Sequence, residues 1–416
     1  MNALTAGNLQ ALLAPAIAPH ASILFAGESL PRELLKSLRP GRVVAVSPDQ
    51  TGWSGEEGMP LEYCQLPLDE LESDASFDCI IMEGNLLERG DMTRTLHTLR
   101  ALCRNNGILV LWVGEQPSVV RRTQNLFSHY GSDRESWLPD HLSESLLETA
   151  GFSIRGRACS WLLAQARPVQ ERRRYSYSIV IPCYNEEGNI AECVERIPDL
   201  QREYEIIVVN DGSTDRTAAV VRSLMASHHH LKLVDYGKNR GKGYATRAGL
   251  NAATKEVLMI LDADMAVRPE DLPLFMEPFE MSDAAFVNGT RMIHPFTREA
   301  MGPVHVFGNR MFSRLLAMLL NHPLTDTLCG TKCLFRKDYQ FFDLRDPDWP
   351  DFDMLFEAAR MNLKIVELPI RYQPRLAGVS KMKTFQHGLL MLLVAFRGYL
   401  KLKTDSGQLR VKTGEM

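Results

Sequence analysis

The second half of the chain contains four short apolar segments, and each of them ends in a cluster of polar residues. Helical patterns separate the segments, so the series predicts β-strands joined by crossover helices in a parallel sheet. Ligands bind at the carboxyl ends of parallel strands. We therefore expect the four polar clusters to meet at one edge of the sheet and to form a binding site.

Apolar periodicity defines the predicted elements of both halves. In the second half the strands are Ser178–Ile181, Tyr204–Val209, Leu231–Val234 and Glu256–Leu261, and the helices are Ile190–Gln201, Arg216–Ser227 and Gly243–Ala253. In the first half the strands are Ser22–Ala26, Arg42–Val46, Phe77–Met82 and Gly107–Val113, and the helices are Leu30–Leu38, Thr93–Arg104 and His141–Ala150. Both halves therefore predict an α/β fold.

The distribution of charged residues also divides the chain into these two halves. Residues 1–166 carry 13 Lys and Arg against 20 Asp and Glu, whereas residues 167–416 carry 34 against 31. The basic segment RPVQERRRYSYS begins where the charge changes. We predict a first domain over 1–166, a basic linker over 167–175, a second domain over 176–383, and a C-terminal amphipathic basic helix and tail over 384–416.

Composition excludes several classes of protein. Hydrophobic residues make up 45% and charged residues 24% of the chain, which is ordinary for a globular protein and excludes a mainly disordered or coiled-coil chain. A net charge of −4 argues against a dedicated nucleic-acid binder. The eight cysteines are irregularly spaced and fit a reducing cytoplasm, and the apolar N-terminal segment lacks the early positive charge of a signal peptide.

The first three polar clusters have features of a nucleotide site. SIVIPCYNEEGNI (178–190) and EIIVVNDGSTD (205–215) place Asn185, Glu187 and Asp211 in loops that follow strands. NRGKGYATRAG (239–249) has two glycines and Lys242 at the predicted start of a helix, an arrangement that suits phosphate. Helix caps and turns use the same residue types, so each loop taken alone has two interpretations.

The fourth cluster carries the strongest chemical signal. In VLMILDADM (257–265) a buried strand ends in Asp262 and Asp264, so two carboxylates spaced by one residue can reach one divalent cation. Carboxylate oxygens are the ligands that Mg²⁺ and Mn²⁺ prefer. We predict that Asp262 and Asp264 bind Mg²⁺ or Mn²⁺ and that the ion bridges a diphosphate.

These four motifs, in this order and spacing, resemble those of glycosyltransferase family 2, whose members have the GT-A fold, invert the anomeric centre and use nucleotide-sugar donors. DTLCGTKCLFRKD (326–338), FDMLFE (352–357) and LPIRYQPRLAGVSKMK (368–383) are similar to the branch that makes polyprenyl-phosphate sugars. The resemblance covers roughly residues 176–400. It implies a GT-A glycosyltransferase domain in the second half of the chain.

The resemblance also implies roles for individual residues. The matches to the family's donor positions are Pro182, Tyr184, Asn185, Glu187 and Asp211, and those to its metal and diphosphate positions are Asp262 and Asp264. We place Lys242, from the glycine loop, with the donor phosphates. Ala266 stands where branch members often have a glutamine, a departure that removes a third candidate ligand. Arg375, Ser380 and Lys381 match an R-x-x-G-x-S-K element that faces phosphates.

The acceptor determines what else the site needs. A phosphate acceptor is largely ionised at neutral pH and needs cations more than a base, so Arg375, Lys381 and Arg291 are candidates to hold it. A hydroxyl acceptor needs a carboxylate base, for which Asp353 is the candidate. Asp264, Asp353, Arg375 and Lys381 are therefore the predicted catalytic residues.

Three features bear on the membrane. No uncharged apolar run reaches the roughly 18–20 residues that span a bilayer. Met311–Leu320 and Thr384–Lys403 are amphipathic, and residues 371–416 carry nine Lys and Arg against two acidic residues. Two interpretations explain these stretches: the helices pack in the core, or they lie at the interface of an anionic leaflet. A lipid acceptor favours the interfacial helix. We expect a cytoplasmic protein that contacts the inner face of the membrane peripherally.

The first half resembles a class I S-adenosylmethionine-dependent methyltransferase, with a Rossmann-like fold, over roughly residues 20–165. AGES (26–29) has a single glycine where such enzymes have a glycine-rich loop, and Ser47 stands where they have an acid for the ribose. We predict a degenerate domain that serves as a scaffold or as a surface for homo-oligomerisation or protein interaction. An active methyltransferase, and with it a bifunctional enzyme, is the alternative.

The predicted function is transfer of a hexose from a UDP- or GDP-sugar to a polyprenyl phosphate at the membrane surface. The alternatives are transfer to a sugar or protein hydroxyl, and a nucleotide-sugar-binding regulator without turnover. The intact pair of aspartates and the R-x-x-G-x-S-K element argue against the regulator. Cys329 and Cys333 have no second pair at a zinc-like spacing and are expected to be buried small residues.

Overall fold

A computed structural model divides the chain into two compact units, residues 1–121 with 133–172 and residues 122–132 with 173–416. The residues it describes are 13, 16–26, 32–46, 61–64, 76–82, 92–112, 139–158, 161–168, 172–294, 301–346, 349–374, 395–396 and 398–399. The division between the units falls at Arg172 and Arg173, inside the segment predicted to be a linker. The extents of the predicted domains stay predictions.

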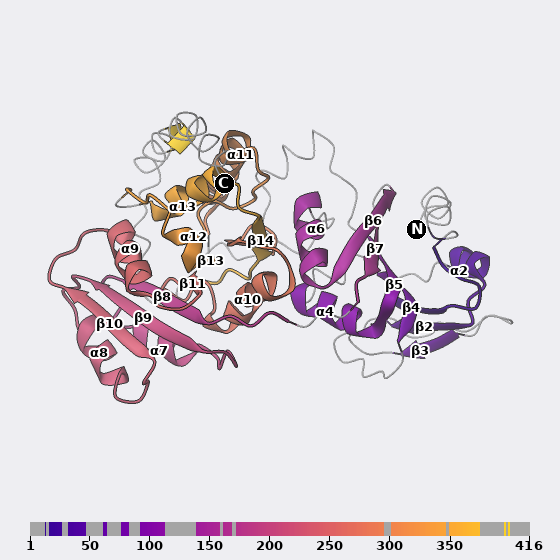
Figure 1. The fold of residues 1–416 in the computed structure, drawn as a ribbon, viewed down its shortest axis with the longest axis horizontal. Coiled ribbons are helices and arrows are strands. Elements are labelled where there is room, and N and C mark those ends of the chain that lie inside the picture. The colour runs from indigo at the N-terminus through magenta and orange to yellow at the C-terminus, as the bar shows by residue number, and fades with distance from the viewer. Residues whose placement is uncertain are drawn as a thin grey trace, which may run out of the picture. The chain divides into compact units, whose positions relative to one another are not determined.

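The first unit contains a seven-stranded sheet in the order β3-β2-β1-β4-β5-β7-β6 (Figure 1). Its strands are β1 (Ser22–Ala26), β2 (Arg42–Val46), β3 (Leu61–Cys64), β4 (Phe77–Met82), β5 (Cys103–Trp112), β6 (Phe152–Ala158) and β7 (Trp161–Ala166). Strands β1 to β5 are parallel, but β7 is antiparallel to both β5 and β6. The prediction of a parallel sheet is therefore wrong for β7. Only two residues separate β6 from β7, and a connection that short joins antiparallel strands.

The helices of the first unit are α2 (Arg32–Leu38), α4 (Met92–Leu102) and α6 (Asp140–Thr149). Leu34 and Leu35 of α2 pack with Ile23, Phe25 and Val43 of the sheet in one buried cluster. Helices α4 and α6 contact each other and reach β5 and β6 respectively. Strands β1 and β4 are almost completely buried. For this reason the sequence of each strand is a nearly continuous run of apolar residues.

The second unit also contains a seven-stranded sheet, in the order β10-β9-β8-β11-β13-β12-β14. Its strands are β8 (Tyr177–Cys183), β9 (Tyr204–Asp211), β10 (Leu231–Tyr236), β11 (Val257–Ile260), β12 (Phe286–Thr290), β13 (Lys332–Phe335) and β14 (Ile365–Pro369). The four predicted strands are present and parallel, whereas β13 is antiparallel to β11 and β12. The prediction is corrected to a mixed sheet. The chain enters β13 from a loop at the carboxyl end of β11, beside Asp262, so β13 runs back along β11.

The helices of the second unit are α7 (Ile190–Glu195), α8 (Thr217–Leu224), α9 (Lys242–Ala252), α10 (Leu272–Met281), α11 (Pro303–Leu320), α12 (Arg336–Tyr339) and α13 (Pro350–Arg360). Helix α9 covers one face of β8 and β9, and α7 and α8 cover the other (Figure 1). Helix α7 ends at Glu195, well before the predicted end at Gln201. Pro198 disfavours helical backbone in the residue before it, which explains the early end.

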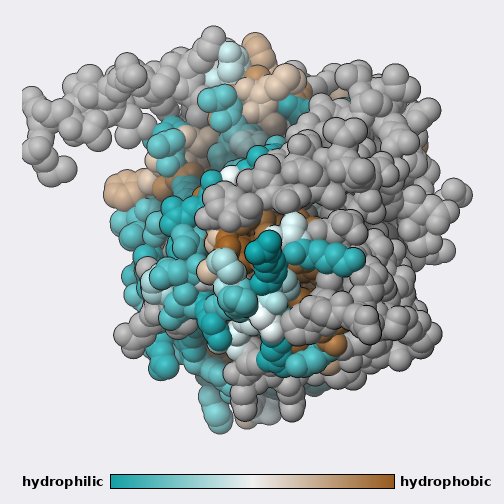
Figure 2. Space-filling model, turned by 90° about the vertical axis from the view of Figure 1, so that its right-hand side faces the viewer, coloured by the Kyte–Doolittle hydropathy of each residue, from teal (hydrophilic) through white to brown (hydrophobic). Residues whose placement is uncertain are grey.

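Within the part of the chain that the structure describes, no helix is both long and apolar enough to cross a membrane. On the face seen in Figure 2, hydrophilic residues form most of the described surface, and apolar residues show in several patches between them. The described cysteines include Cys329 and Cys333, which are fully buried and unbonded, as predicted for small core residues.

A buried glutamate ties together the edge of the sheet opposite the polar clusters. Glu205, at the start of β9, accepts hydrogen bonds from Ser178 Oγ at 2.7 Å and from the Thr254 backbone N–H at 2.7 Å, and it pairs with the Lys232 ammonium. Burial by itself would raise the pKa of Glu205, but the Lys232 ammonium and these donors outweigh burial and lower the pKa to about 2. The charged carboxylate is therefore the form that the fold stabilises.

We predict that acid removes this contribution. A carboxyl whose pKa is lowered by folding stabilises the fold above its unfolded pKa and loses that effect as pH falls, here from about 4.5 towards 2. Glu205→Gln should lower stability by about 1–3 kcal/mol at neutral pH, because Lys232 and the buried donors lose a charged acceptor. Its deficit against the wild type should shrink as pH approaches 2, measured as thermal midpoints across the pH range.

The exposed Glu203→Gln is the matched control, since Glu203 pairs with Lys255 at the surface. Its thermal midpoint should follow that of the wild type at every pH. A deficit of Glu205→Gln that stays constant from pH 7 to pH 2 would contradict the assigned cause.

Candidate functional site

Three polar loops lie together at the carboxyl edge of β8, β9 and β11. The parallel register aligns Cys183 of β8 with Asn210 of β9, and the Leu261 backbone N–H after β11 donates to the Val180 carbonyl at 3.0 Å. The loop that begins at Tyr184, the loop at Asp211 and the segment at Asp262 therefore emerge side by side. The structure brings the predicted polar clusters to one edge, as parallel strands require.

Side chains tie the first two loops to each other. Asn185 accepts from the Thr214 backbone N–H at 2.8 Å, and its own backbone N–H donates to Ser213 Oγ at 2.9 Å. Glu187 accepts from the Arg216 backbone N–H at 2.9 Å. Asn185 has a φ of 55°, which an asparagine tolerates better than most residues. These two residues therefore shape the loop pair, and their contact with a donor stays a prediction.

The remaining residues predicted for the first loop differ in exposure. Pro182 is buried within β8, and Tyr184 is half-buried where the strand ends. Pro182 has no N–H to donate, and its contact with a donor stays a prediction. Tyr184 is thus the member of this pair that has surface to offer to a bound molecule.

Asp211 organises the glycine loop. This buried carboxylate accepts from the Arg240 backbone N–H at 2.8 Å, from the Gly241 backbone N–H at 3.0 Å and from the Tyr236 hydroxyl at 2.9 Å. Gly241 precedes α9 with a φ of 92°, which favours glycine. Asp211 therefore determines where α9 begins, and through it the position of Lys242.

Lys242 reaches from the first turn of α9 to the carboxylate of Asp262. Its Nζ lies 2.8 Å from Oδ1 and 3.1 Å from Oδ2 of Asp262, and 4.0 Å from Oδ2 of Asp351. Burial alone would lower the pKa of Lys242, but the carboxylates of Asp262 and Asp351 outweigh burial and raise that pKa well above its ordinary value. The ammonium is therefore a permanent positive charge inside the candidate site.

The arrangement around Asp262 and Asp264 fits a divalent ion bound together with a diphosphate. Among the residues that the structure describes, no group of three or more His, Cys, Asp or Glu side chains could hold a metal ion. Mg²⁺ commonly takes one or two carboxylates plus substrate phosphates, which two aspartates satisfy. The Lys242 ammonium at Asp262 shows that the carboxylate accepts a cation at this place. Asp264 accepts from the Ala266 backbone N–H at 3.1 Å, which orients its carboxylate.

A glycine next to Asp262 has no side chain, and this leaves space for the aspartate's carboxylate. A Cβ added to Gly330 would lie 2.1 Å from Asp262 Oδ2, so the loop over residues 326–331 approaches the carboxylate as closely as a backbone can. The motif CGTK was visible in the sequence, but its contact with Asp262 was not. Sequence reasoning missed Gly330, because a close approach between segments 68 positions apart leaves no local pattern.

The structure also draws attention to Asp351, which the sequence analysis did not select. Asp351 is buried in the first turn of α13, with its Oδ1 3.5 Å from Lys332 Nζ and its Oδ2 4.0 Å from Lys242 Nζ. Asp353, the predicted base, accepts instead from the backbone N–H groups of Arg345 and Asp346 at 2.7 Å each. The carboxylate of α13 beside Lys242 is therefore that of Asp351, and a catalytic role of Asp353 stays a prediction.

Arg291 does not have the free guanidinium expected of a residue that holds an acceptor phosphate. It forms a buried two-point ion pair with Asp326, with Nε–Oδ2 at 2.6 Å and Nη2–Oδ1 at 2.9 Å, and its guanidinium lies 5.0 Å from the Tyr372 ring centre. Burial would raise the pKa of Asp326, but Arg291 outweighs burial and lowers the pKa to about 2. The pair braces the start of the loop that carries Gly330.

The other predicted acceptor cations belong to the segment that follows residue 374. Arg375, Ser380 and Lys381 lie outside the described residues, as does most of Thr384–Lys403. Of that C-terminal stretch the structure describes residues 395, 396, 398 and 399, where Ala395 joins the core and Gly398 lies against the Phe356 ring of α13. The roles of Arg375 and Lys381 stay predictions.

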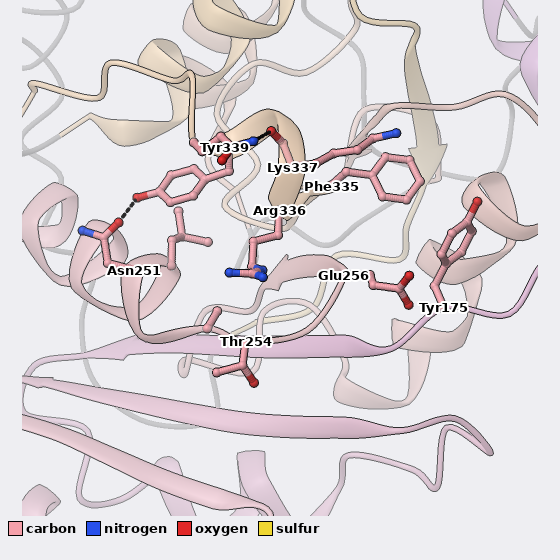
Figure 3. A pocket seen from close by; sticks show the side chains of 11 residues that line it. Tyr175, Asn251, Thr254, Glu256, Phe335, Arg336, Lys337 and Tyr339 are labelled. Atoms are coloured by element: carbon pink, nitrogen blue, oxygen red, sulfur yellow. Dashed lines mark hydrogen bonds between the residues drawn. The ribbon is translucent and has the colours of Figure 1, made fainter.

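A cavity of about 560 Å³ lies at the opposite edge of the same sheet (Figure 3). Tyr175, Glu256, Phe335 and Arg336 line it, next to the points where β8 and β11 begin. Several of its polar side chains pair among their neighbours: the Tyr339 hydroxyl donates to Asn251 at 2.9 Å, and Glu256 accepts from Ser176. The aspartates follow the end of β11, so this cavity is separate from the candidate site.

Comparison with protein families indicates which kind of domain carries this edge of the sheet. The model of glycosyltransferase family 2 matches residues 178–340, which include all but the first residue of β8, the glycine loop, both aspartates and Gly330. Residues 178–340 form a glycosyltransferase family 2 domain. The family resemblance predicted from the four motifs is confirmed. The polar edge described above is therefore the candidate active site of a glycosyltransferase domain.

Curated relatives of the glycosyltransferase domain share under a third of their residues with this chain. A low-salt glycan biosynthesis hexosyltransferase of Haloferax volcanii is 29% identical over 54% of this chain and 54% of its own length. A dolichyl-phosphate beta-glucosyltransferase of Trichomonas vaginalis is 28% identical over 50% of this chain and 70% of its own length. A poly-beta-1,6-N-acetyl-D-glucosamine synthase of Staphylococcus epidermidis is 31% identical over 48% of both chains. This chain thus spans about half to seven tenths of the length of these relatives.

Solved structures similar to the chain include glucosyl-3-phosphoglycerate synthase of Mycobacterium tuberculosis in complex with Mn²⁺, UDP and glucosyl-3-phosphoglycerate. The two proteins are 20% identical over 53% of this chain and 80% of that one, with a TM-score of 0.42. At this level of likeness the assignment of the glycosyltransferase domain rests on the sequence matches.

We predict that Gly330→Ala impairs the glycosyltransferase site while the fold persists. The added methyl group would displace the Asp262 carboxylate, the flexible end of a side chain, from the place where it is predicted to bind the metal. Transfer activity and Mn²⁺ affinity should both fall at least about tenfold, with a small change in thermal midpoint. Gly308→Ala in α11 is the matched control, because no atom lies within 4 Å of the added Cβ. Full activity of Gly330→Ala would contradict the geometry described for Asp262.

Proposed function

We propose that the chain is an inverting, metal-dependent glycosyltransferase that transfers a hexose from a UDP- or GDP-sugar to a polyprenyl phosphate at the membrane surface. One observation carries the proposal: the Asp262 carboxylate stands at the end of β11, inside the family 2 domain, where it already holds a cation. Relatives named dolichyl-phosphate beta-glucosyltransferase support a polyprenyl-phosphate acceptor.

The chemistry follows from the charges. Departure of a nucleoside diphosphate from the sugar leaves negative charge on the leaving group, and the site must stabilise it. Asp262 and Asp264 would hold the divalent ion, which when bound neutralises that charge. Lys242 adds a permanent cation beside the same place. Asp211 holds the glycine loop, and α9, which begins directly after it, offers the positive end of a helix to phosphate.

Helix α11 supports action at a lipid surface. Val304, Met311 and Met318 are spaced by seven residues, so they form one stripe along the helix, and they are 63%, 47% and 73% exposed. Arg314 is exposed on the same helix. An exposed apolar stripe beside cations suits the surface of an anionic leaflet, where a polyprenyl phosphate would present its head group.

We predict that the purified protein, incubated with Mn²⁺, a polyprenyl phosphate and labelled UDP-glucose or GDP-mannose, yields a labelled product that extracts into organic solvent. Asp264→Ala should reduce transfer at least about a hundredfold, because the site loses one of its two acidic ligands. Asp283→Ala is the control, since Asp283 is a surface residue paired with Arg173. Wild-type activity in Asp264→Ala would exclude the metal-dependent mechanism.

The assay also separates the alternatives. A labelled product that stays in the aqueous phase would indicate a hydroxyl acceptor, for which Asp351 beside Lys242 is the nearest carboxylate that the structure describes on α13. Tight binding of the donor without any product would indicate a nucleotide-sugar-binding regulator.

For the first unit we propose a degenerate methyltransferase-like scaffold. Its strand order reverses between β1 and β4, which is the point where sheets of this type bind a cofactor. The segments AGES (26–29) and Ser47–Asp49 follow β1 and β2, and beyond Ala26 they lie outside the described residues. The proposal thus depends on composition: one glycine where a loop rich in glycine is needed.

We predict that calorimetry detects no binding of S-adenosylmethionine to the full chain at micromolar concentrations. A single glycine leaves side chains where the backbone would have to approach the cofactor closely. UDP or GDP, titrated into the same sample, is the positive control for folded protein. Micromolar binding of S-adenosylmethionine would favour a bifunctional enzyme instead.

A further inference from the structure

Lys242 occupies the position at Asp262 that a divalent ion needs. Its Nζ lies within hydrogen-bonding distance of both carboxylate oxygens, at 2.8 and 3.1 Å. A bound Mg²⁺ or Mn²⁺ would lie about 2.0–2.2 Å from one of these oxygens. An ammonium and a divalent ion on one carboxylate repel each other strongly, so they compete for Asp262.

The Lys242 ammonium has a second carboxylate near it. Its Nζ lies 4.0 Å from Oδ2 of Asp351. Asp351 is also held by the buried Lys332, at 3.5 Å, so it does not depend on Lys242 for compensation of its charge. Lys242 stands in the first turn of α9, and a helix N-terminus favours a nearby phosphate. A diphosphate bound there would attract the ammonium away from Asp262.

We propose that Lys242 acts as a removable counter-ion of Asp262, which the donor diphosphate withdraws, so that donor and metal bind cooperatively. This inference rests on the proposed function and adds the order of events at the site. Without the donor, the ammonium keeps the metal affinity low. With the donor, Asp262 becomes available, and the diphosphate supplies further oxygen ligands. By linkage, the metal strengthens donor binding by the same factor.

The test measures Mn²⁺ binding through the electron paramagnetic resonance signal of the free ion, with and without UDP, or GDP where UDP does not bind. For the wild type, nucleotide should tighten Mn²⁺ binding about tenfold or more. Lys242→Met should bind Mn²⁺ alone about tenfold more tightly than the wild type does, and the nucleotide should tighten that binding by a smaller factor than in the wild type. Lys242→Arg, which keeps the charge, should behave more like the wild type.

The control variant is Lys238→Met, because Lys238 is an exposed lysine four residues earlier in the same loop. It removes one positive charge without touching Asp262, so its Mn²⁺ affinity should match the wild type. Thermal midpoints of all variants establish that they fold, and Lys242→Gln replaces Lys242→Met if the latter does not.

The outcomes separate two kinds of failure. If the wild type and Lys238→Met show cooperative binding but Lys242→Met binds Mn²⁺ no more tightly than they do, the role of Lys242 is wrong and the proposed function stands. If the wild type binds neither Mn²⁺ nor nucleotide, the proposed function fails, and this inference with it.

Discussion

The parallel alignment of β8, β9 and β11 is the constraint on which the candidate site depends. Because the three strands run in one direction and end at one edge, the loops at Tyr184, Asp211 and Asp262 leave the sheet within reach of one another. The strands themselves are almost fully buried, so their positions are determined by packing and not by the polar residues that follow them. A rigid sheet edge thereby carries the flexible side chains of the site.

Many polar residues at this edge have structural duties that also prepare the site. Asp211 holds two backbone N–H groups of the glycine loop, and Asn185 and Glu187 connect the first loop to the second. The acidic residues are compensated in turn: Lys242 lies at Asp262, and Lys332 lies at Asp351. Charges that are buried without partners would destabilise the fold, so this network of opposite charges lets the site collect carboxylates without a bound ligand.

Local sequence patterns indicated one part of the candidate site and missed another part. Asp262 and Asp264 were visible because two acids directly after an apolar strand are unusual, and parallel strands have a known polar edge. Asp351 was not, because Asp351 and Asp353 lie two positions apart in one helical turn and only the packing of α13 shows which one faces Lys242. Likewise, Arg291 was a candidate to hold the acceptor phosphate, but Asp326, 35 positions later, pairs with it inside the protein.

The sequence by itself determined the α/β character of both halves, the four parallel strands of the glycosyltransferase domain, and the family to which residues 178–340 belong. These properties follow from hydrophobic periodicity and from motifs a few residues long, which depend only on near neighbours in the chain. The tertiary structure alone decided the antiparallel places of β7 and β13, the close approach of Gly330 to Asp262, and the pairing of Lys242 with that carboxylate. Each of these joins segments many residues apart, and such contacts arise only when the whole core packs.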